Sequence, residues 1–435
     1  MTLPLFADTA NATDATDAAD AASIAASATA HHWRDGFMPP TASGAAPSQW
    51  RQPRTTPIFE FPHNRWAFSH LRELQPTRNV PRGHCPAAPL PRTDRDDLDT
   101  RGFVPLQEGM PATWQEALAA VHADGVVVLH RGRVVYERYF GALQEDGQHM
   151  AMSVTKSVVG TVGAMLAAEG VLDPEAMVTH YIPELAASAF GTATVRQVMD
   201  MTTALDYSED YADPDASVWG YARAGELLPR PAGYAGPQGF RQFLQTVPQL
   251  GVHGDAFAYQ TVNTDVLGWL ISRAAGQSLA CVLSERIWSR LGAEQDAAFA
   301  LDGQGAESAG GGLSCGLRDL ARFGEMMRLG GRFNGAQIVP EAVVDDIRRG
   351  ADPARFAKAG MVRLAGWSYR NMWWVAHDPH GSFTAQGIHG QMLHIDPVAE
   401  MVVARFASHP LAAHGHLPTV MPAFRALAAR LMQGH

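Results

Sequence analysis

The 435-residue sequence predicts an α+β fold, in which an antiparallel sheet is flanked by helices and carries a mostly helical inserted domain. Two strand-like runs around a turn occupy residues 125–139, and further strand-like runs follow residue 350. The stretch between them has apolar residues at helical spacing. Strands at both ends of a chain with helices between them indicate one sheet that is built from the N- and C-terminal parts.

The first hundred residues are expected to add little to that body. Residues 1–48 form an Ala/Asp-rich leader, and its lack of large apolar side chains predicts disorder. Residues 49–105 contain repeated prolines that forbid long helices, so they predict an extended, wrapping arm anchored by Trp66, Phe68 and Leu71. The main domain is then predicted at residues 106–435, with the helical subdomain at about 171–345.

Within the main domain, the 125–139 hairpin turns at Arg131-Gly132, and Thr194 to Gln197 read as a capping box that opens a short helix. Residues 207–239 lose periodicity and gain Asp, Pro and Gly, which is typical of a lid or a disordered crossing. Helices are predicted at residues 114–122, 153–168, 241–246, 264–275, 284–291, 317–327 and 419–432, and later strands at 372–376, 382–385, 392–395 and 401–406.

Composition argues against several classes of protein. The 34 Lys and Arg and 44 Asp and Glu give a net charge of −10 without a basic cluster, so nucleic acid is not an expected partner. Cys85, Cys281 and Cys315 lie far apart, which predicts reduced thiols. The absence of a long apolar run or a secretory leader predicts a cytoplasmic protein without a membrane partner. The histidine spacings match no known zinc site, so no metal or other cofactor is expected.

Ser153 and Lys156 are the residues that point to chemistry. A serine three residues before a lysine, at the start of an apolar helix, places hydroxyl and amine on one face about one turn apart. The chain has only two lysines, Lys156 and Lys358, and uses arginine for its other positive charges. Lysine, unlike arginine, can lose its proton when it is held out of water. We interpret Lys156 as the base for Ser153; the alternative is a helix-capping serine followed by a solvated charge.

A serine nucleophile also needs a proton carrier for the leaving group and donors for the developing oxyanion. Tyr259 lies just ahead of the helix predicted at 264–275, and a phenol near a cation is expected to have a lowered pKa and to exchange protons near neutrality. A tyrosine considered alone is more often a packing residue. The glycine-containing stretch 387–391 is a candidate strand edge that supplies one oxyanion donor.

In chain order these residues resemble the Ser-x-x-Lys, Tyr-x-Asn and Lys-Thr-Gly elements of the serine β-lactamases and penicillin-binding proteins. The likeness is greater to the branch of that family that contains 6-aminohexanoate-dimer hydrolase, a nylon-oligomer amidase, and related carboxylesterases. It rests on five segments in register, which together span about residues 50–425: residues 65–74, 152–157, 201–211, 259–269 and 387–397.

The resemblance implies a serine β-lactamase-like fold and a serine hydrolase that cleaves a small linear amide or ester without a cofactor. It implies Ser153 as the acylated nucleophile, Lys156 as its base and Tyr259 as the proton carrier to the leaving group. The oxyanion would be held by the backbone amides of Ser153 and, by strand alignment, Gln391.

The resemblance also implies residues that contact the substrate. Tyr211 is similar to the family tyrosine that reaches over the substrate from the mobile loop, with Tyr207 as the alternative for that part. Simple loop packing is favoured for Trp219. His389 and Gly390 stand at the strand edge, where His389 either contacts substrate or only packs.

The sequence departs from the antibiotic-degrading pattern in two places. Thr261 stands where Tyr-x-Asn has its asparagine, and residues 388–390 are Ile-His-Gly in place of Lys-Thr-Gly. In the β-lactamases that strand helps to hold the substrate carboxylate, so loss of its cation argues against efficient β-lactam turnover. A non-turnover penicillin-binding or acyl-accepting receptor is the alternative function, a degenerate scaffold protein is a third, and a homodimer is left open.

Overall fold

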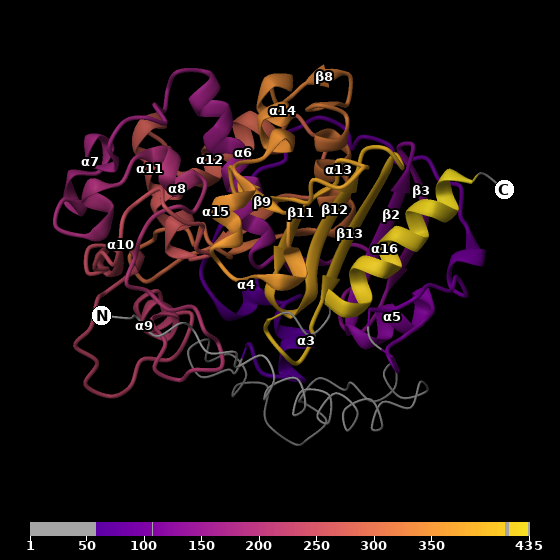
Figure 1. Ribbon diagram of the computed structural model, residues 1–435, viewed down its shortest axis with the longest axis horizontal. Helices are drawn as coiled ribbons and strands as arrows, with labels where there is room; N and C mark the ends of the chain where they lie inside the picture. Colours follow the sequence, from indigo (N-terminus) through magenta and orange to yellow (C-terminus); the bar gives the residue numbers. More distant parts are fainter. Residues whose placement is uncertain (1–57, 107, 414–416, 434–435) are drawn as a thin grey trace.

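The computed structural model describes residues 58–106, 108–413 and 417–433 (Figure 1). The leader predicted at 1–48 therefore lies outside the described residues, as do residues 49–57 at the start of the arm. At the centre of the molecule is a seven-stranded antiparallel sheet with the order β3-β2-β13-β12-β11-β10-β9. Its strands are β2 (Ala123–His130), β3 (Arg133–Tyr139), β9 (Ser368–Arg370), β10 (Trp373–Val375), β11 (Phe383–Gly387), β12 (Gln391–Asp396) and β13 (Met401–Ala407).

The sheet joins the two ends of the chain. The first hairpin, β2 and β3, turns at Arg131 and Gly132, both of which have positive φ as such a tight turn requires. Strand β2 then pairs along most of its length with β13, from residues far away in sequence. Both strands are almost wholly buried because helices cover the two faces of the sheet. The predicted α+β fold is confirmed.

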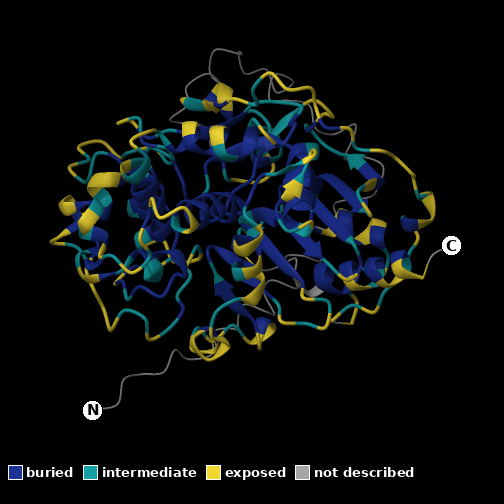
Figure 2. Cartoon of the chain, turned by 90° about the horizontal axis from the view of Figure 1, so that it is seen from above, coloured by how far each residue is buried: buried dark blue, intermediate teal, exposed yellow. Residues whose placement is uncertain are grey.

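Each face of the sheet carries its own helices (Figure 2). Helices α6 (Val154–Ala168) and α13 (Leu317–Arg328) pack on one face, where Gly324 lets α13 approach Val402 and Leu393. Helix α16 (Leu417–Met432) packs on the other face beside α5 (Trp114–Ala120), with the Phe424 ring 5.0 Å from the His394 ring. Helix α6 is buried along nearly all of its length, so the residues of its first turn lie inside the protein.

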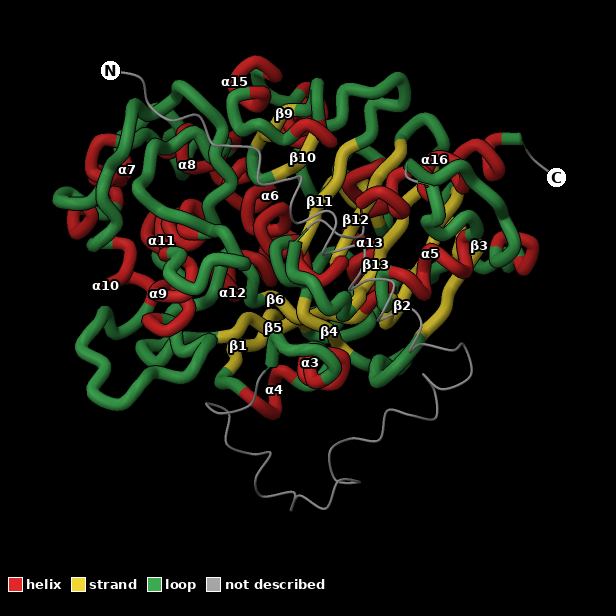
Figure 3. Tube along the Cα trace, turned by 60° about the horizontal axis from the view of Figure 1, so that its bottom comes forward, coloured by secondary structure: helices red, strands yellow, loops and turns green. Residues whose placement is uncertain are grey.

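A second, smaller sheet has the order β1-β5-β6-β4 and lies beneath the first (Figure 3). Its strands are β1 (Thr77–Val80), β4 (Gln148–Met150), β5 (Ala297–Ala300) and β6 (Leu313–Gly316). The preceding arm folds as the short helices α3 (His63–Ala67) and α4 (Leu71–Leu74). Phe68 and Leu71 of the arm are buried against Met150 and Met152, whereas Trp66 is half-buried and stacks on His70. The arm therefore lies directly under the turn that precedes α6.

Helices dominate the stretch between the strands of the main sheet. They are α7 (Val178–Tyr181), α8 (Val195–Met199), α9 (Ser217–Ala224), α10 (Phe240–Leu244), α11 (Val262–Ala275), α12 (Leu279–Leu283), α14 (Glu341–Arg349) and α15 (Pro353–Ala357). The capping box at Thr194 and Gln197 is confirmed, since each side chain bonds the other's backbone amide. Two short strands, β7 (Arg332–Phe333) and β8 (Ala336–Gln337), form a separate hairpin. In the described part of the chain no single helix is long and apolar enough to cross a membrane, although the bent pair Val262–Ala275 and Leu279–Trp288 passes by length and composition.

Residues 207–239 are more ordered than a lid or disordered crossing, because helix α9 lies within them. Val218, Tyr221 and Ala222 are buried, and Tyr221 stacks on Phe240 with 5.0 Å between ring centroids. The eight-residue helix was not predicted because its apolar positions are interrupted by glycine and arginine, and only the packing against α10 makes them one face. The three cysteines carry free thiols.

Candidate active site

Ser153 occupies the N-cap position of α6, and its hydroxyl does not cap the helix. The chain reaches it through Met152, whose positive φ of 46° turns the backbone sharply before the helix. Ser153 Oγ instead accepts a hydrogen bond from Lys156 Nζ at 2.7 Å, one turn along the helix. The helix-capping alternative for Ser153 is therefore wrong, and the predicted Ser153–Lys156 pair is formed.

Lys156 is buried, with 1% of its surface exposed. Besides Ser153, its Nζ donates to the backbone carbonyl of Gly310 at 2.5 Å. Burial lowers the pKa of this amine to about 8, while the negative charges of Glu209 and Asp265 act in the opposite direction. A solvated surface lysine would show none of these features, so that alternative is wrong as well.

Tyr259 faces the same pair. The Lys156 ammonium lies 5.2 Å from the centroid of the Tyr259 ring, and the ring is stacked at 5.2 Å on Trp374. The pKa of Tyr259 is raised and not lowered as predicted, chiefly because burial disfavours the phenolate and next because Glu209 is close, although a side-chain hydrogen bond with Ser153 opposes this. The lowered pKa was predicted from the nearby cation alone, whereas burial has the larger effect. At neutral pH this residue is a phenol.

A pocket of about 190 Å³ opens onto Ser153. It is lined mainly by apolar and backbone groups, together with one carboxylate: Ser153, Glu209, Tyr211, Tyr259, Met361, Trp374, Gln386, Gly387, Ile388, Ala412 and Ala413. These residues come from the start of α6, the segment before α9, the approach to α11, strand β10, one end of β11, and two loops that contain Met361 and residues 412–413. The pocket thus lies between the main sheet and the helical region, where a cleft was expected.

The strand edge beside Ser153 is at Gly387 and Ile388. A Cβ at Gly387 would lie 2.9 Å from the Ser153 backbone nitrogen and 3.0 Å from the Ala151 carbonyl, so only glycine allows this approach. Gln391 pairs with Gly387 from the next strand, its side chain bonds the backbone of Ala407, and it is not among the residues that line the pocket. The turn of residues 388–390 separates β11 from β12, so Gln391 begins the second strand, opposite Gly387.

His389 and Gly390 lie behind this edge and do not line the pocket. His389 adopts a positive φ of 59°, its Nδ1 pairs with the His409 carbonyl at 2.7 Å, and its ring packs 5.3 Å from the ring of Phe68. Burial lowers the pKa of His389 to about 4, so the ring is uncharged at neutral pH. The Gly390 carbonyl accepts a hydrogen bond from Arg405 Nε. The geometry favours the packing alternative for His389.

The segment before α9 contributes Tyr211, and not Tyr207, to the pocket. The Tyr211 hydroxyl donates to Glu209 at 2.8 Å, and its ring meets Trp219 edge-on. Tyr207 is buried and packs against Phe243. Trp219 donates to the Asp213 carbonyl at 2.7 Å, which agrees with the loop packing that the sequence favoured.

Glu209 and Asp265 are charged residues of the site that sequence reasoning missed. Glu209 accepts hydrogen bonds from the backbone amide of Thr261 at 2.6 Å and from its hydroxyl. The residue that stands in place of the family asparagine therefore binds a carboxylate. A signal existed, since Glu209 lies in one of the five segments of resemblance. Asp265 lies in the first turn of α11.

Comparisons with known proteins show the family to which the chain belongs. The family model described as Beta-lactamase matches residues 112–417. The 6-aminohexanoate-dimer hydrolase of Paenarthrobacter ureafaciens is 37% identical over 354 residues, which are 81% of this chain and 87% of that protein. Esterase EstB of Burkholderia gladioli is 28% identical over 189 residues, 40% of this chain and 45% of the esterase.

Among solved structures, one from Bacillus anthracis that carries the 6-aminohexanoate-dimer hydrolase name superposes with a TM-score of 0.81 at 30% identity. The match covers 89% of this chain and 99% of that one. The family match and the coverage of the two proteins named 6-aminohexanoate-dimer hydrolase both exceed what a shared motif or a partial domain would give. The chain therefore belongs to the β-lactamase family and is a hydrolase related to the 6-aminohexanoate-dimer hydrolases and esterases.

Proposed function

We propose that the protein is a serine hydrolase that cleaves small linear amides or esters through an acyl-enzyme on Ser153. The observation that carries the proposal is the buried hydrogen bond of 2.7 Å between Lys156 Nζ and Ser153 Oγ. An amine whose pKa burial lowers to about 8 is neutral in a useful fraction of molecules near neutrality, and the neutral amine can accept the hydroxyl proton. The names of the related hydrolase and esterase support amide and ester substrates.

Acylation joins Ser153 Oγ to the substrate carbonyl carbon while the hydroxyl proton passes to Lys156 Nζ. The negative charge that develops on the carbonyl oxygen is met by the amides of Ser153 and Ile388, at the start of α6 and the end of β11. The C–N or C–O bond then breaks. Tyr259 gives its proton to the leaving amine or alcohol and regains one from the Lys156 ammonium; its raised pKa keeps it protonated for this step.

Deacylation uses water in place of the leaving group. Water forms a bond to the acyl carbon and gives up a proton through Tyr259 and Lys156. The ester bond to Ser153 breaks, the serine oxygen regains a proton, and a carboxylic acid leaves. The same three side chains therefore serve both half-reactions, in reverse order of proton transfer.

The pocket lining indicates which substrates fit. Glu209 is its only charged residue among the described ones, and His389 at the Lys-Thr-Gly position is buried and neutral. A substrate carboxylate near the scissile bond would meet a negative charge and no cation. We expect neutral or cationic acyl and amine groups to be accepted, and β-lactams to be poor substrates.

The test is hydrolysis of p-nitrophenyl acetate and butyrate, 6-aminohexanoate dimer and nitrocefin by one preparation of the enzyme and its Ser153→Ala and Lys156→Ala variants. Each variant is expected to lose about 10³-fold or more in kcat. Retention of the parent rate by both variants rejects the proposal. Mass spectrometry separates turnover from the receptor alternative, because a persistent acyl adduct on Ser153 without product release is the mark of a non-turnover receptor.

A further inference from the structure

Two carboxylates face the Lys156 amine from different elements. Asp265 projects from the first turn of α11, and its Oδ1 accepts the backbone N–H of Gly310 at 3.1 Å. The carbonyl of the same Gly310 accepts the hydrogen bond from Lys156 Nζ at 2.5 Å. The backbone of Gly310 therefore links Asp265 to the Lys156 amine. Glu209 lines the pocket that opens onto Ser153, and its charge acts on the same amine.

Each of these carboxylates is held by a tyrosine from one segment of the chain, residues 207–224. The Tyr211 hydroxyl donates to Glu209 Oε1 at 2.8 Å, and the Tyr221 hydroxyl donates to Asp265 Oδ2 at 2.8 Å. Tyr221 is buried in helix α9, whereas Tyr211 is only partly buried and lines the pocket. This segment therefore contributes to the pocket lining and bonds both carboxylates near the proposed base.

We propose that Glu209 and Asp265 are positioning residues that set the charge state of Lys156, and that residues 207–224 act on the base through them. The inference rests on the proposed function, since it takes Lys156 to be the base. Carboxylates near a buried amine favour its ammonium form, so their loss or rearrangement favours the neutral, proton-accepting form. Tyr211 and Tyr221 hold the two carboxylates, so their hydrogen bonds set how strongly each carboxylate acts on the amine.

The other groups around Lys156 do not supply this control. Tyr259 and Ser153 contact the amine, but the raised pKa of Tyr259 keeps it uncharged. Tyr221 is also a phenol, because burial and Asp265 raise its pKa well above the usual value. The pKa of Asp265 is itself raised to about 7, chiefly by burial. Asp265 therefore gains its negative charge in the same pH range in which the base must act.

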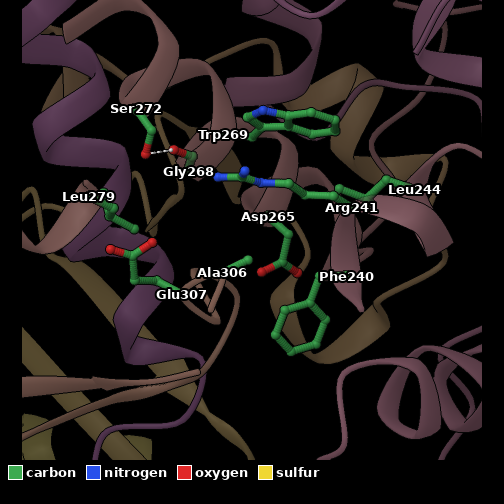
Figure 4. Close-up of a pocket in the computed structure, with 10 residues that line it drawn as sticks. All are labelled: Phe240, Arg241, Leu244, Asp265, Gly268, Trp269, Ser272, Leu279, Ala306 and Glu307. Atoms are coloured by element: carbon green, nitrogen blue, oxygen red, sulfur yellow. Dashed lines mark hydrogen bonds between the residues drawn. The ribbon is translucent and has the colours of Figure 1, made fainter. Parts of the chain in front are cut away.

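Behind Asp265 lies a second pocket of about 20 Å³, which it shares with Arg241 and Glu307 (Figure 4). A space of that size holds about one water molecule. Asp265 thus bonds the Gly310 backbone and also lines this small cavity.

The two-lysine composition makes a direct test possible. Enzyme labelled with [¹³Cε]lysine has only two lysine signals, from Lys156 and the half-exposed Lys358, and Lys358→Arg assigns them. The titration midpoint of Lys156 is measured in the parent, Glu209→Gln and Asp265→Asn. We expect each variant to lower it by about one pH unit. Asp210→Asn, which removes an exposed charge from the adjacent position, is the matched control and is expected to leave it unchanged.

A double-mutant comparison tests the connection to the segment. Tyr211→Phe should move the Lys156 midpoint in the parent but not in Glu209→Gln, and Tyr221→Phe should do so in the parent but not in Asp265→Asn. An unchanged midpoint in both carboxylate variants overturns the proposal, as do fully additive tyrosine effects. If Asp265→Asn does not fold, Glu209→Gln decides. Because the titration needs no turnover, it is independent of the Ser153→Ala result that tests the proposed function.

Discussion

The pocket has two walls, the start of α6 and the end of β11, which contribute different kinds of chemical group. At the start of α6 the chemistry lies in side chains, with Ser153 and Lys156 held one turn apart inside the protein. At the end of β11 it lies in the backbone, where Gly387 and Ile388 bring the main chain beside the Ser153 nitrogen. A side-chain site depends on residue identity, and a backbone site depends on register and on the absence of a Cβ. Substitutions should therefore act on the two walls in different ways.

Lys156→Arg should have the largest effect, because it keeps the charge and removes the ability to lose a proton. We expect kcat for p-nitrophenyl acetate to fall about 10³-fold or more. Lys358→Arg is the matched control: that lysine is half-exposed and pairs with Asp255, so kcat should not change. If Lys156→Arg retains activity, the side chain at position 156 does not act by accepting a proton.

Gly387→Ala tests the second wall. The new methyl group would lie 2.9 Å from the Ser153 nitrogen, so β11 must move away from the nucleophile. A displacement of about 1 Å is expected to lower kcat about 10²-fold with a smaller change in KM. Gly102→Ala is the control, because the nearest atom to its Cβ is 3.6 Å away and the site is exposed. If the two variants are equally active, the position of β11 does not affect the reaction.

The pH dependence of kcat/KM separates the contribution of Lys156 from that of the β11 backbone without any substitution. Burial lowers the pKa of Lys156 to about 8, and the proposed function takes the neutral amine as the active form. The rate constant kcat/KM should therefore rise as the pH increases through about 8 and level off above it, with about a tenfold difference between pH 7 and the plateau. The backbone wall contributes no titrating group. A profile that is flat from pH 6 to 9 would contradict the role of Lys156.

His389→Gln should have the smallest effect on activity, about threefold or less in kcat/KM, because the ring packs behind the strand edge. Its effect should appear in stability. The pKa of His389 is lowered to about 4 in the folded state, so its contribution is present above the unfolded pKa of about 6.5 and is lost as the pH falls toward 4. The variant should lose less stability than the parent between pH 6.5 and 4, as measured by urea unfolding.

The sequence was a good guide where the pattern is local. The hairpin β2–β3, the capping box at Thr194, and the helix that follows Ser153 all depend on residues a few positions apart, and all three are present. It failed at Tyr259, whose pKa follows from burial among residues distant in sequence. It also failed to find α9, whose apolar face exists only against α10.

By itself the sequence determined that a hydroxyl and an amine stand on one face of a helix, because a Ser-x-x-Lys spacing on a helix fixes a hydroxyl–amine distance wherever that helix lies. The tertiary structure decided what surrounds them. Water exclusion from Lys156, the two carboxylates that face it, and the glycine approach of β11 each join segments separated by fifty residues or more. Burial and charge act through space, so only the packed molecule sets the strength of the base.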